Sequence, residues 1–332
     1  MGLEPVDDRR EATMVKAELD RAGRRLKRLL HDPMGVISRR FSGADAGNAP
    51  YVPAVGPFAA LGDKARNTGL DRLYLFLSFD CDTDLDIAAS EELHAFLGGL
   101  GIKMTMAVPG TQLRNGAAVY ESLATQGVEF INHGYLPHAA WHEDRYVSTT
   151  FYHEMGEAAV AEDIRQGHQA VMEVIGRAPA GFRAPHFGHF QEPEHLELVY
   201  SLARQLGYRY CSTTSPTAAY AHGPVYDVGG LVELPTSGSV RAPTTILDSW
   251  TYLTDRRDYA LSEDYADLMI ETVDTLIEQG IPGILSWYGD PAHVIGQAPF
   301  ERAMQHLSAR RLVSLTGTEA AALIGTQPGN RP

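Results

Sequence analysis

Beyond Leu70, short apolar segments alternate with segments of helical periodicity for most of the remaining chain. Strands that alternate with helices build parallel sheets, because each parallel connection needs a crossover. We predict strands at residues 73–79, 103–108, 128–132, 181–184, 208–212, 231–235, 283–287 and 312–315. We predict helices at residues 88–99, 116–126, 156–175, 194–206, 262–279 and 299–309. This succession favours a barrel over an open sheet.

The N-terminal part of the chain has a different pattern. Between residues 9 and 30, apolar residues recur at spacings of three and four, which predicts an amphipathic helix. Residues 42–62 are rich in Gly, Pro and Ala and have no periodicity, so we predict a linker or an extended arm. We therefore divide the chain into an N-terminal extension, residues 1–62, and a barrel domain, residues 63–332. The helix is expected to pack on the barrel or on a second subunit, which makes a homo-oligomer possible, with a membrane surface or another partner as the alternative.

The composition excludes several classes of partner. The chain of 332 residues carries a formal net charge of −14, which repels nucleic acid and anionic membranes. Two cysteines are too few for a secreted disulfide scaffold, although one disulfide could form. The first thirty residues lack the apolar core of a signal peptide, and no apolar run reaches the roughly 18 residues of a membrane span. We expect a cytoplasmic protein.

Carboxylates gather at the end of the first predicted strand. Asp80 and Asp82 follow this strand directly, at the end of the barrel where catalytic loops collect. Two carboxylates this close repel one another, so the folded protein must bind a cation there or raise one pKa. The alternative is that these residues cap the following helix, a role that suits Asp84 or Asp86 better.

The third predicted strand ends in two histidines, His133 and His138, on the same face as Asp82. One carboxylate with two imidazoles forms an open site for a divalent metal and leaves positions for water and substrate. His142 competes with His138, because the two could share one face of a helix. Arg183 emerges from the fourth strand, where its rigid guanidinium could orient Asp80 and keep it ionised.

At these residues the sequence resembles the polysaccharide deacetylases, the NodB-homology domain of carbohydrate esterase family four. The family's first motif, Thr-Phe-Asp-Asp-Gly, is similar to residues 78–82, with one residue between the acids as in its Asp-x-Asp subgroup. Its second motif, His-x-x-x-His, is approximated by residues 133–138, where the spacing is five instead of four and Pro137 must bulge the loop. Its third, Arg-x-Pro-Tyr, is approximated by residues 183–186. The similarity covers roughly residues 70–316.

The family's last motif, Leu-x-His, is absent. The last barrel-face strand reads Ile-Leu-Ser-Trp at residues 284–287, and the next histidine is His293 in the following loop. His293 could reach back and serve as the general acid that the family takes from this motif. The alternative is a surface histidine without a role.

The resemblance implies an irregular TIM-like (β/α)7 barrel that hydrolyses an amide, most simply by N-deacetylation of an N-acetylated sugar or sugar conjugate. Asp80 is then the base that activates a metal-bound water, with Arg183 and His293 as the other catalytic residues. Asp82, His133 and His138 are the expected ligands of one divalent metal, for which zinc is our prediction and cobalt, nickel or iron the alternatives. The residues expected to contact substrate are Tyr135, Pro185, His186 and Trp287.

Other functions remain open at this point. Relatives of this fold open cyclic amides such as ureides and imides. A barrel without the Leu-x-His motif could also be a non-catalytic sugar-binding protein. A scaffold assembled through the N-terminal helix is a third possibility.

Overall fold

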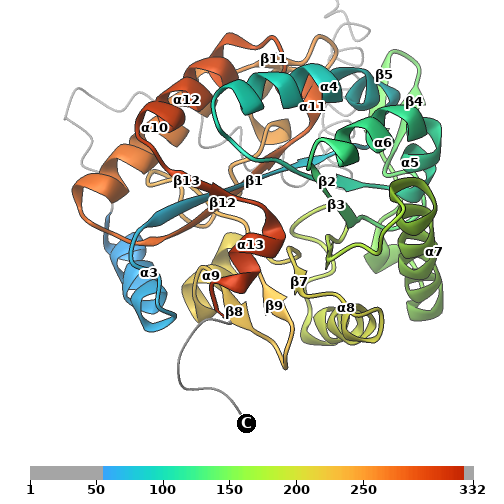
Figure 1. The fold of residues 1–332 in the computed structure, drawn as a ribbon, viewed down its shortest axis with the longest axis horizontal. Coiled ribbons are helices and arrows are strands. Elements are labelled where there is room, and N and C mark those ends of the chain that lie inside the picture. Colours follow the sequence, from blue (N-terminus) through green and yellow to red (C-terminus); the bar gives the residue numbers. More distant parts are fainter. Residues whose placement is uncertain (1–54, 325–332) are drawn as a thin grey trace, which may run out of the picture. The chain divides into compact units, whose positions relative to one another are not determined.

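The computed structural model describes residues 55–324, and in this part of the chain helices surround a central curled sheet (Figure 1). The strands of the sheet are β1 (Leu73–Asp80), β2 (Thr105–Val108), β3 (Glu129–Asn132), β6 (Gly181–Phe182), β7 (Tyr210–Cys211), β8 (Tyr226–Asp227), β9 (Val232–Glu233), β12 (Gly283–Gly289) and β13 (Val313–Leu315). The helices are α3 (Val55–Asn67), α4 (Asp84–Gly99), α5 (Gly110–Asn115), α6 (Ala117–Thr125), α7 (Glu157–Ile175), α8 (Pro193–Gln205), α9 (Pro216–His222), α10 (Glu263–Glu278), α11 (Pro291–Val294), α12 (Ala298–Ala309) and α13 (Gly317–Ala322). The amphipathic helix predicted at residues 9–30 lies outside the described residues.

The sheet has the parallel order expected of a barrel. Its strands follow one another as β12-β1-β2-β3-β6-β7-β9-β8, and β13 pairs with the first half of β1. All these pairs are parallel except the edge pair of β8 with β9. Beyond β9 the chain returns to β12, where the Ser237 N–H donates to the Ser286 carbonyl at 2.8 Å. The irregular (β/α)7 barrel predicted from the sequence is confirmed.

Alternation along β1 decides which side chains reach the inside of the barrel. Leu77 and Phe79 pack in the same core cluster as Met304 of α12, so the odd-numbered side chains face the helices. Ser78 and Asp80 point the opposite way, toward Arg183. Successive side chains of a strand point to opposite faces, so an acid at every second position comes to lie on one side. The carboxyl end of β1 therefore directs polar groups into the barrel.

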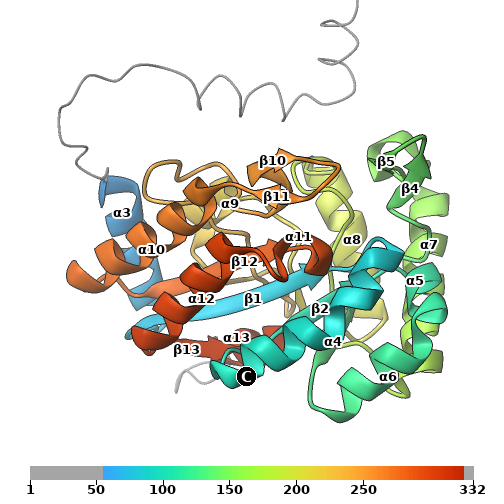
Figure 2. The same ribbon diagram turned by 90° about the horizontal axis from the view of Figure 1, so that it is seen from above.

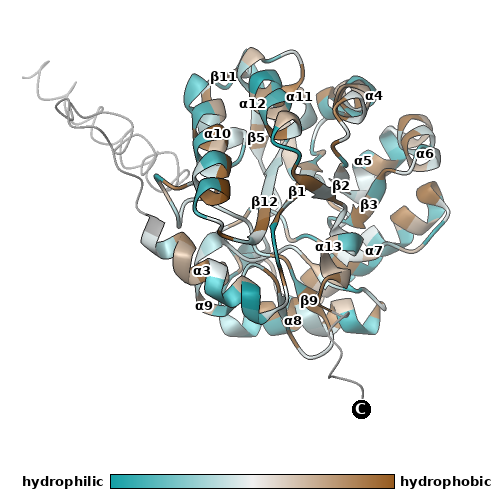
Figure 3. Cartoon of the chain, turned by 60° about the vertical axis from the view of Figure 1, so that its left-hand side comes forward, coloured by the Kyte–Doolittle hydropathy of each residue, from teal (hydrophilic) through white to brown (hydrophobic). Residues whose placement is uncertain are grey.

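The outer helices are amphipathic. Along α10 the buried residues include Tyr265, Leu268, Met269 and Thr272, at the spacing of one helical face. Ser262 begins this helix, since its hydroxyl accepts from the Asp264 N–H at 3.2 Å. Figure 3 shows hydrophobic and hydrophilic residues on different sides of α10 and α12. The helices thus cover the sheet with their apolar sides, and within residues 55–324 no helix is long and apolar enough to cross a membrane.

The structure differs from the sequence prediction just before β1. We expected residues 42–62 to form a linker or arm, but residues 55–62 begin α3, and Phe58 and Leu61 are buried in the main core. Phe58 meets the edge of the Tyr220 ring at a centroid distance of 6.0 Å. The glycines and prolines of this segment hid the helix, because only three positions between residues 55 and 62, Val55, Phe58 and Leu61, carry large apolar side chains.

Two small hairpins were not predicted. Strands β4 (Ala139–His142) and β5 (Arg145–Ser148) form one, and β10 (Leu253–Asp255) and β11 (Ala260–Leu261) form the other. Short 3-10 turns at Tyr152–Glu154 and Trp250–Tyr252 lie next to them in the chain. Both hairpins lie along the upper edge of the molecule in Figure 2.

Candidate active site

Asp80 is held by an arginine from a neighbouring part of the barrel. One carboxylate oxygen, Oδ1, accepts from Arg183 Nη1 at 2.7 Å. Arg183 Nη2 donates to the hydroxyls of Ser78 at 2.7 Å and Ser212 at 3.0 Å, so the guanidinium cannot turn. The other carboxylate oxygen of Asp80 lies 3.8 Å from His133 Nε2. The predicted contact between Arg183 and Asp80 is present, and it leaves one oxygen of Asp80 directed at the histidines.

The loop after β3 is shaped to present its histidines. Asp163 of α7 accepts the backbone N–H groups of Tyr135 and Leu136 at 3.1 and 2.8 Å. Gly134 has a φ of +78° and lies so close to the Asp163 carboxylate that a Cβ atom would collide with it. The bulge predicted for this loop therefore depends on a glycine and a buried carboxylate.

His133 has a defined tautomer. Its Nδ1 lies 2.9 Å from the Arg183 carbonyl oxygen, and a carbonyl can only accept, so Nδ1 carries the proton. Nε2 is then unprotonated and has a free lone pair, and it lies 3.8 Å from Asp82 Oδ1. A metal-binding histidine typically donates its other ring N–H to such a carbonyl.

Asp82, His133 and His138 form a group whose potential ligand atoms all lie within 4.8 Å of one another. His138 Nδ1 lies 3.4 Å from Asp82 Oδ1. Neither nitrogen of His138 nor Oδ1 of Asp82 has a hydrogen-bond partner among the described residues, although all three atoms are buried. Buried polar atoms without partners are costly, and a divalent cation would satisfy them. The donor set of one carboxylate and two imidazoles fits such an ion.

The electrostatics of this group also suit a cation. Burial raises the pKa of Asp82 to about 8, and the nearby Asp290 adds to this rise. Burial raises the pKa of Asp80 to about 7, although Arg183 opposes the change. Burial lowers the pKa of His138 to about 4 and that of His133 well below its ordinary value. Neutral imidazoles are the form that binds a metal, and a bound cation would favour the ionised carboxylates.

His293 lies at the edge of this site. It is 6% exposed on the short helix α11, and its Nδ1 lies 2.7 Å from Asp290 Oδ2. Burial lowers the pKa of His293, but Asp290, Asp86 and Asp248 together raise it above its ordinary value, and Asp290 contributes most to this rise. The charge of His293 is also near enough to lower the pKa of Asp82. His293 is therefore a buried, paired imidazole and not a surface residue, and its partner Asp290 was not identified from the sequence.

The structure corrects the expectation for Trp287. This side chain is completely buried, and its indole N–H donates to the Gly238 carbonyl at 3.3 Å. Its neighbour Tyr288 faces the barrel interior instead, with its ring 5.3 Å from the Arg183 guanidinium carbon. Successive side chains of β12 point to opposite faces of the sheet, so Trp287 points toward the helices and Tyr288 toward the site. The same alternation could have identified Tyr288 from the sequence.

The other residues expected to contact substrate have different positions. The Tyr135 hydroxyl accepts from Arg114 of α5 at 2.8 Å, which turns it away from the histidines. Pro185 is buried next to Arg183. His186 lies beside His138 with ring centroids 5.8 Å apart, and its Nε2 contacts the Thr149 carbonyl oxygen at 2.6 Å.

His142 is not part of the group. It ends the exposed strand β4, so the helix on which it was to share a face with His138 does not exist. His138 precedes this strand and is buried against Asp82.

Comparison with known families identifies the fold. The family profile described as polysaccharide deacetylase matches residues 70–211, a range that includes Asp80, Asp82, both loop histidines and Arg183. Over residues 70–211 the chain is similar to the polysaccharide deacetylase family. Its members are hydrolases that act on carbon–nitrogen amide bonds, the reaction class predicted from the sequence. No curated protein sequence matches the chain significantly.

Solved structures share the fold of this deacetylase domain. A protein assigned as a polysaccharide deacetylase from Mycobacterium smegmatis is 19% identical with a TM-score of 0.56, over 79% of this chain and 95% of the other. One from Pseudomonas aeruginosa PAO1 is 14% identical with a TM-score of 0.56, over 86% and 97%. The Puue allantoinase is 13% identical with a TM-score of 0.56, over 85% and 96%. At these identities the likeness concerns the fold alone.

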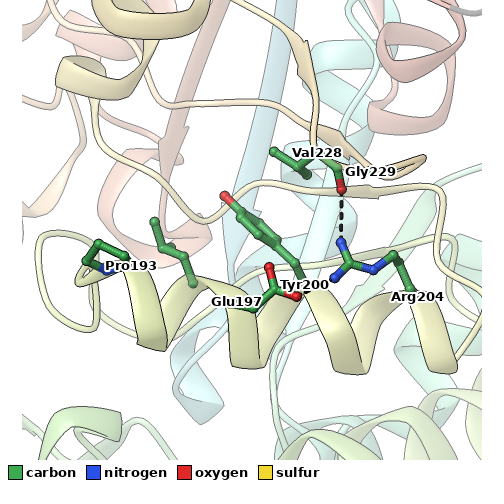
Figure 4. A pocket seen from close by; sticks show the side chains of 7 residues that line it. Pro193, Glu197, Tyr200, Arg204, Val228 and Gly229 are labelled. Atoms are coloured by element: carbon green, nitrogen blue, oxygen red, sulfur yellow. Dashed lines mark hydrogen bonds and ion pairs between the residues drawn. The ribbon is translucent and has the colours of Figure 1, made fainter.

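A shallow groove of about 480 Å³ lies between α8 and the turn that joins β8 to β9 (Figure 4). Arg204 closes one end, where it donates to the Val228 carbonyl at 2.9 Å and pairs with Glu197 at 2.6 Å. The groove contains none of the residues of the site around Asp80. Its two charged side chains, Arg204 and Glu197, are already paired, so we assign it no catalytic role.

Proposed function

We propose that this protein is a metal-dependent N-deacetylase of an N-acetylated sugar or sugar conjugate. The observation that carries the proposal is the placement of Asp80 between Arg183 and the group of Asp82, His133 and His138. Arg183 occupies one oxygen of Asp80, and the other oxygen faces the two histidines. A base in this position can accept a proton from a water that attacks a carbonyl bound at the same point.

The proposed metal ligands are Asp82, His133 and His138, and zinc is the metal that suits this donor set best. When bound, the ion would polarise the amide carbonyl and stabilise the negative charge that develops on its oxygen. Arg183 keeps the Asp80 carboxylate oriented, and His133 keeps its Nε2 lone pair free because Nδ1 donates to a carbonyl.

His293 is the proposed acid for the leaving amine. It is paired with Asp290, and this carboxylate raises the pKa of His293, which favours the protonated form that an acid needs. In this proposal the acid comes from α11, after β12, and not from β12 itself.

The decisive experiment measures metal content and acetate release on the same purified preparation. We expect about one zinc per chain and acetate from N-acetylated amino sugars. Asp80→Asn should retain the metal and lose at least about a hundredfold in kcat, because the amide keeps the shape of the carboxylate but cannot accept a proton. An unchanged rate in Asp80→Asn would contradict the role of base.

A cyclic amide is the second candidate substrate, because the fold matches the Puue allantoinase as well as it matches the two deacetylases. Ring opening of allantoin or a hydantoin releases no acetate, so a parallel assay with these compounds separates the two classes. Bound metal without turnover in either assay would favour a sugar-binding protein.

Two further expectations belong with this proposal. We propose a cytoplasmic location, which is supported by two free and buried cysteines, Cys81 and Cys211. We also keep the proposal that residues 1–62 support a homo-oligomer through the helix predicted at residues 9–30.

A further inference from the structure

Two hairpins that lie outside the central sheet converge on the site. The first, β4–β5, leaves the barrel directly after His138, one of the proposed metal ligands. Three hydrogen bonds hold the base of this hairpin. The Thr149 N–H donates to the His138 carbonyl at 2.7 Å, and the hydroxyls of Thr149 and Thr150 donate to the Pro137 carbonyl. The direction of this hairpin is therefore coupled to the position of His138.

The second hairpin, β10–β11, covers the proposed acid. Tyr259, in its turn, places its ring 4.4 Å from that of His293. Trp250, just before the hairpin, lies 5.8 Å from His293 and under the guanidinium of Arg256 at 4.3 Å. The imidazole thus contacts two aromatic rings in addition to Asp290.

The turns of the two hairpins meet. Arg257 Nη2 in the turn of β10–β11 lies 2.8 Å from Asp144 Oδ2 in the turn of β4–β5. One hairpin is fixed beside the proposed ligand His138 and the other beside the proposed acid His293, so the joined turns bridge the two sides of the site.

We propose that the Asp144–Arg257 pair closes an arch over the site, and that the enzyme therefore acts end-on, on short substrates or on the terminal unit of a chain. This inference rests on the proposed function. A polymer that lies across the site would need to pass through the space that the joined hairpins occupy. A terminal unit can enter beneath them.

The exposed apolar side chains support this mode of entry. Six large hydrophobic side chains are exposed among residues 55–324, and three of them lie within a few residues of the site residues in sequence: Leu85 after the acidic strand end, Leu136 in the histidine loop and Trp141 on β4. Trp141 is 60% exposed and stands against the edge of Tyr146 at 5.1 Å. A sugar unit that remains outside the arch can stack its ring face on this exposed tryptophan.

The test maps the position of the freed amine on a hexamer of N-acetylglucosamine, using zinc-loaded full-length protein and fragment mass spectrometry. Wild type should free the amine of a terminal unit. Arg257→Asp places like charges opposite one another, and the ratio of terminal to internal deacetylation should fall by roughly fivefold or more. Asp144→Arg combined with Arg257→Asp restores an opposite pair and should restore the ratio. Because the pair is exposed, about 1 M salt should lower the ratio in wild type and change it little in Arg257→Asp.

Arg302→Ala is the control, because Arg302 is another exposed arginine that pairs with Glu263 and Asp267, on the outer helices. Its ratio should equal that of wild type. Internal units freed by wild type as fast as terminal ones would overturn the arch while leaving the deacetylase proposal intact. No acetate from the hexamer or from the monomer, with metal bound, would instead remove the proposed function and the substrate class together.

Discussion

At the scale of single residues, the proposed metal site depends on a few side chains whose polar atoms have no other partner. Asp82 Oδ1 and both nitrogens of His138 are buried without hydrogen bonds among the described residues. His133 is oriented by the Arg183 carbonyl. These side chains have no evident structural task other than to bind a ligand.

Removing one of these ligands should release the metal. We expect Asp82→Ala and His133→Ala each to weaken zinc binding by at least about a hundredfold, because a three-ligand site that loses a ligand keeps little affinity. Zinc retained after dialysis against a chelator, measured by elemental analysis, tests this. His142→Ala is the control, since this histidine is exposed four residues beyond His138, and it should retain its metal. Full retention in Asp82→Ala and His133→Ala would exclude the site.

The pair of His293 and Asp290 predicts a pH dependence. Asp290 holds the pKa of His293 above its ordinary value, so the protonated acid persists to higher pH and activity is lost as the pH rises through that pKa. Asp290→Asn removes the main cause of the rise, and the basic limb of the profile of kcat/KM should move to lower pH. Asp274→Asn serves as control, because it alters a distant Asp–His pair with His306 on the outer helices. A basic limb that stays in place in Asp290→Asn would show that another group is the acid.

His293 should also distinguish substrates by their leaving groups. His293→Ala should lower kcat on an amide by a factor on the order of 10² to 10⁴, and much less on an activated ester that needs no proton. Equal losses on both would indicate a role in binding instead.

At the scale of elements, α3 shows how a helix can escape prediction and still matter for stability. Its buried face is formed by Phe58, Leu61 and Ala65, and the rest of the helix is small or polar. Phe58 is 2% exposed against Tyr220 of α9. The helix thus attaches the segment before β1 to the core.

Phe58→Ala should lower the free energy of unfolding by about 3–5 kcal/mol, because it leaves a cavity where a phenyl ring was buried. Urea unfolding followed by circular dichroism measures the change. Met172→Ala on α7 removes a large apolar side chain that is 42% exposed and should cost less than about 0.5 kcal/mol. Similar losses in the two variants would mean that α3 does not pack as described.

At the scale of the whole molecule, one carboxylate ties the C-terminal helix to three strands. Glu129 on β3 accepts from Thr105 of β2 at 2.9 Å and from Tyr210 of β7 at 3.0 Å. It also accepts from the backbone N–H of Gly317 at 2.7 Å and from Thr318 at the start of α13. These bonds join parts of the chain that are up to 189 residues apart in sequence.

Glu129→Ala should destabilise the fold by about 1–3 kcal/mol, because it leaves several partly buried donors without an acceptor. The metal content and the rate on a short substrate should not change, since Glu129 contacts none of the proposed site residues. Glu121→Ala, an exposed carboxylate on α6, is the control for stability and should behave as wild type. An unfolding midpoint equal to that of wild type in Glu129→Ala would contradict this account.

The sequence by itself determined the barrel and the group of acids and histidines at its strand ends. The repeat of apolar residues and the spacing of the strands can be seen in short stretches of sequence. Parallel strands necessarily bring their carboxyl ends to one edge of the sheet. Asp80, Asp82, His133 and Arg183 could therefore be placed together from the order of the strands alone. The choice of His138 over His142 could not be made in this way. It depended on whether the loop became a helix or the start of β4, and contacts with Asp163 and Thr149 decide that.

Only the tertiary structure decided which face Trp287 and Tyr288 present, that α3 packs on the core, and that Asp290 partners His293. It alone brought Asp144 and Arg257 together, 113 residues apart. Such contacts join segments that have no periodic relation in sequence. Their geometry follows from how the barrel curls and where its loops end, and a local pattern carries no information about either.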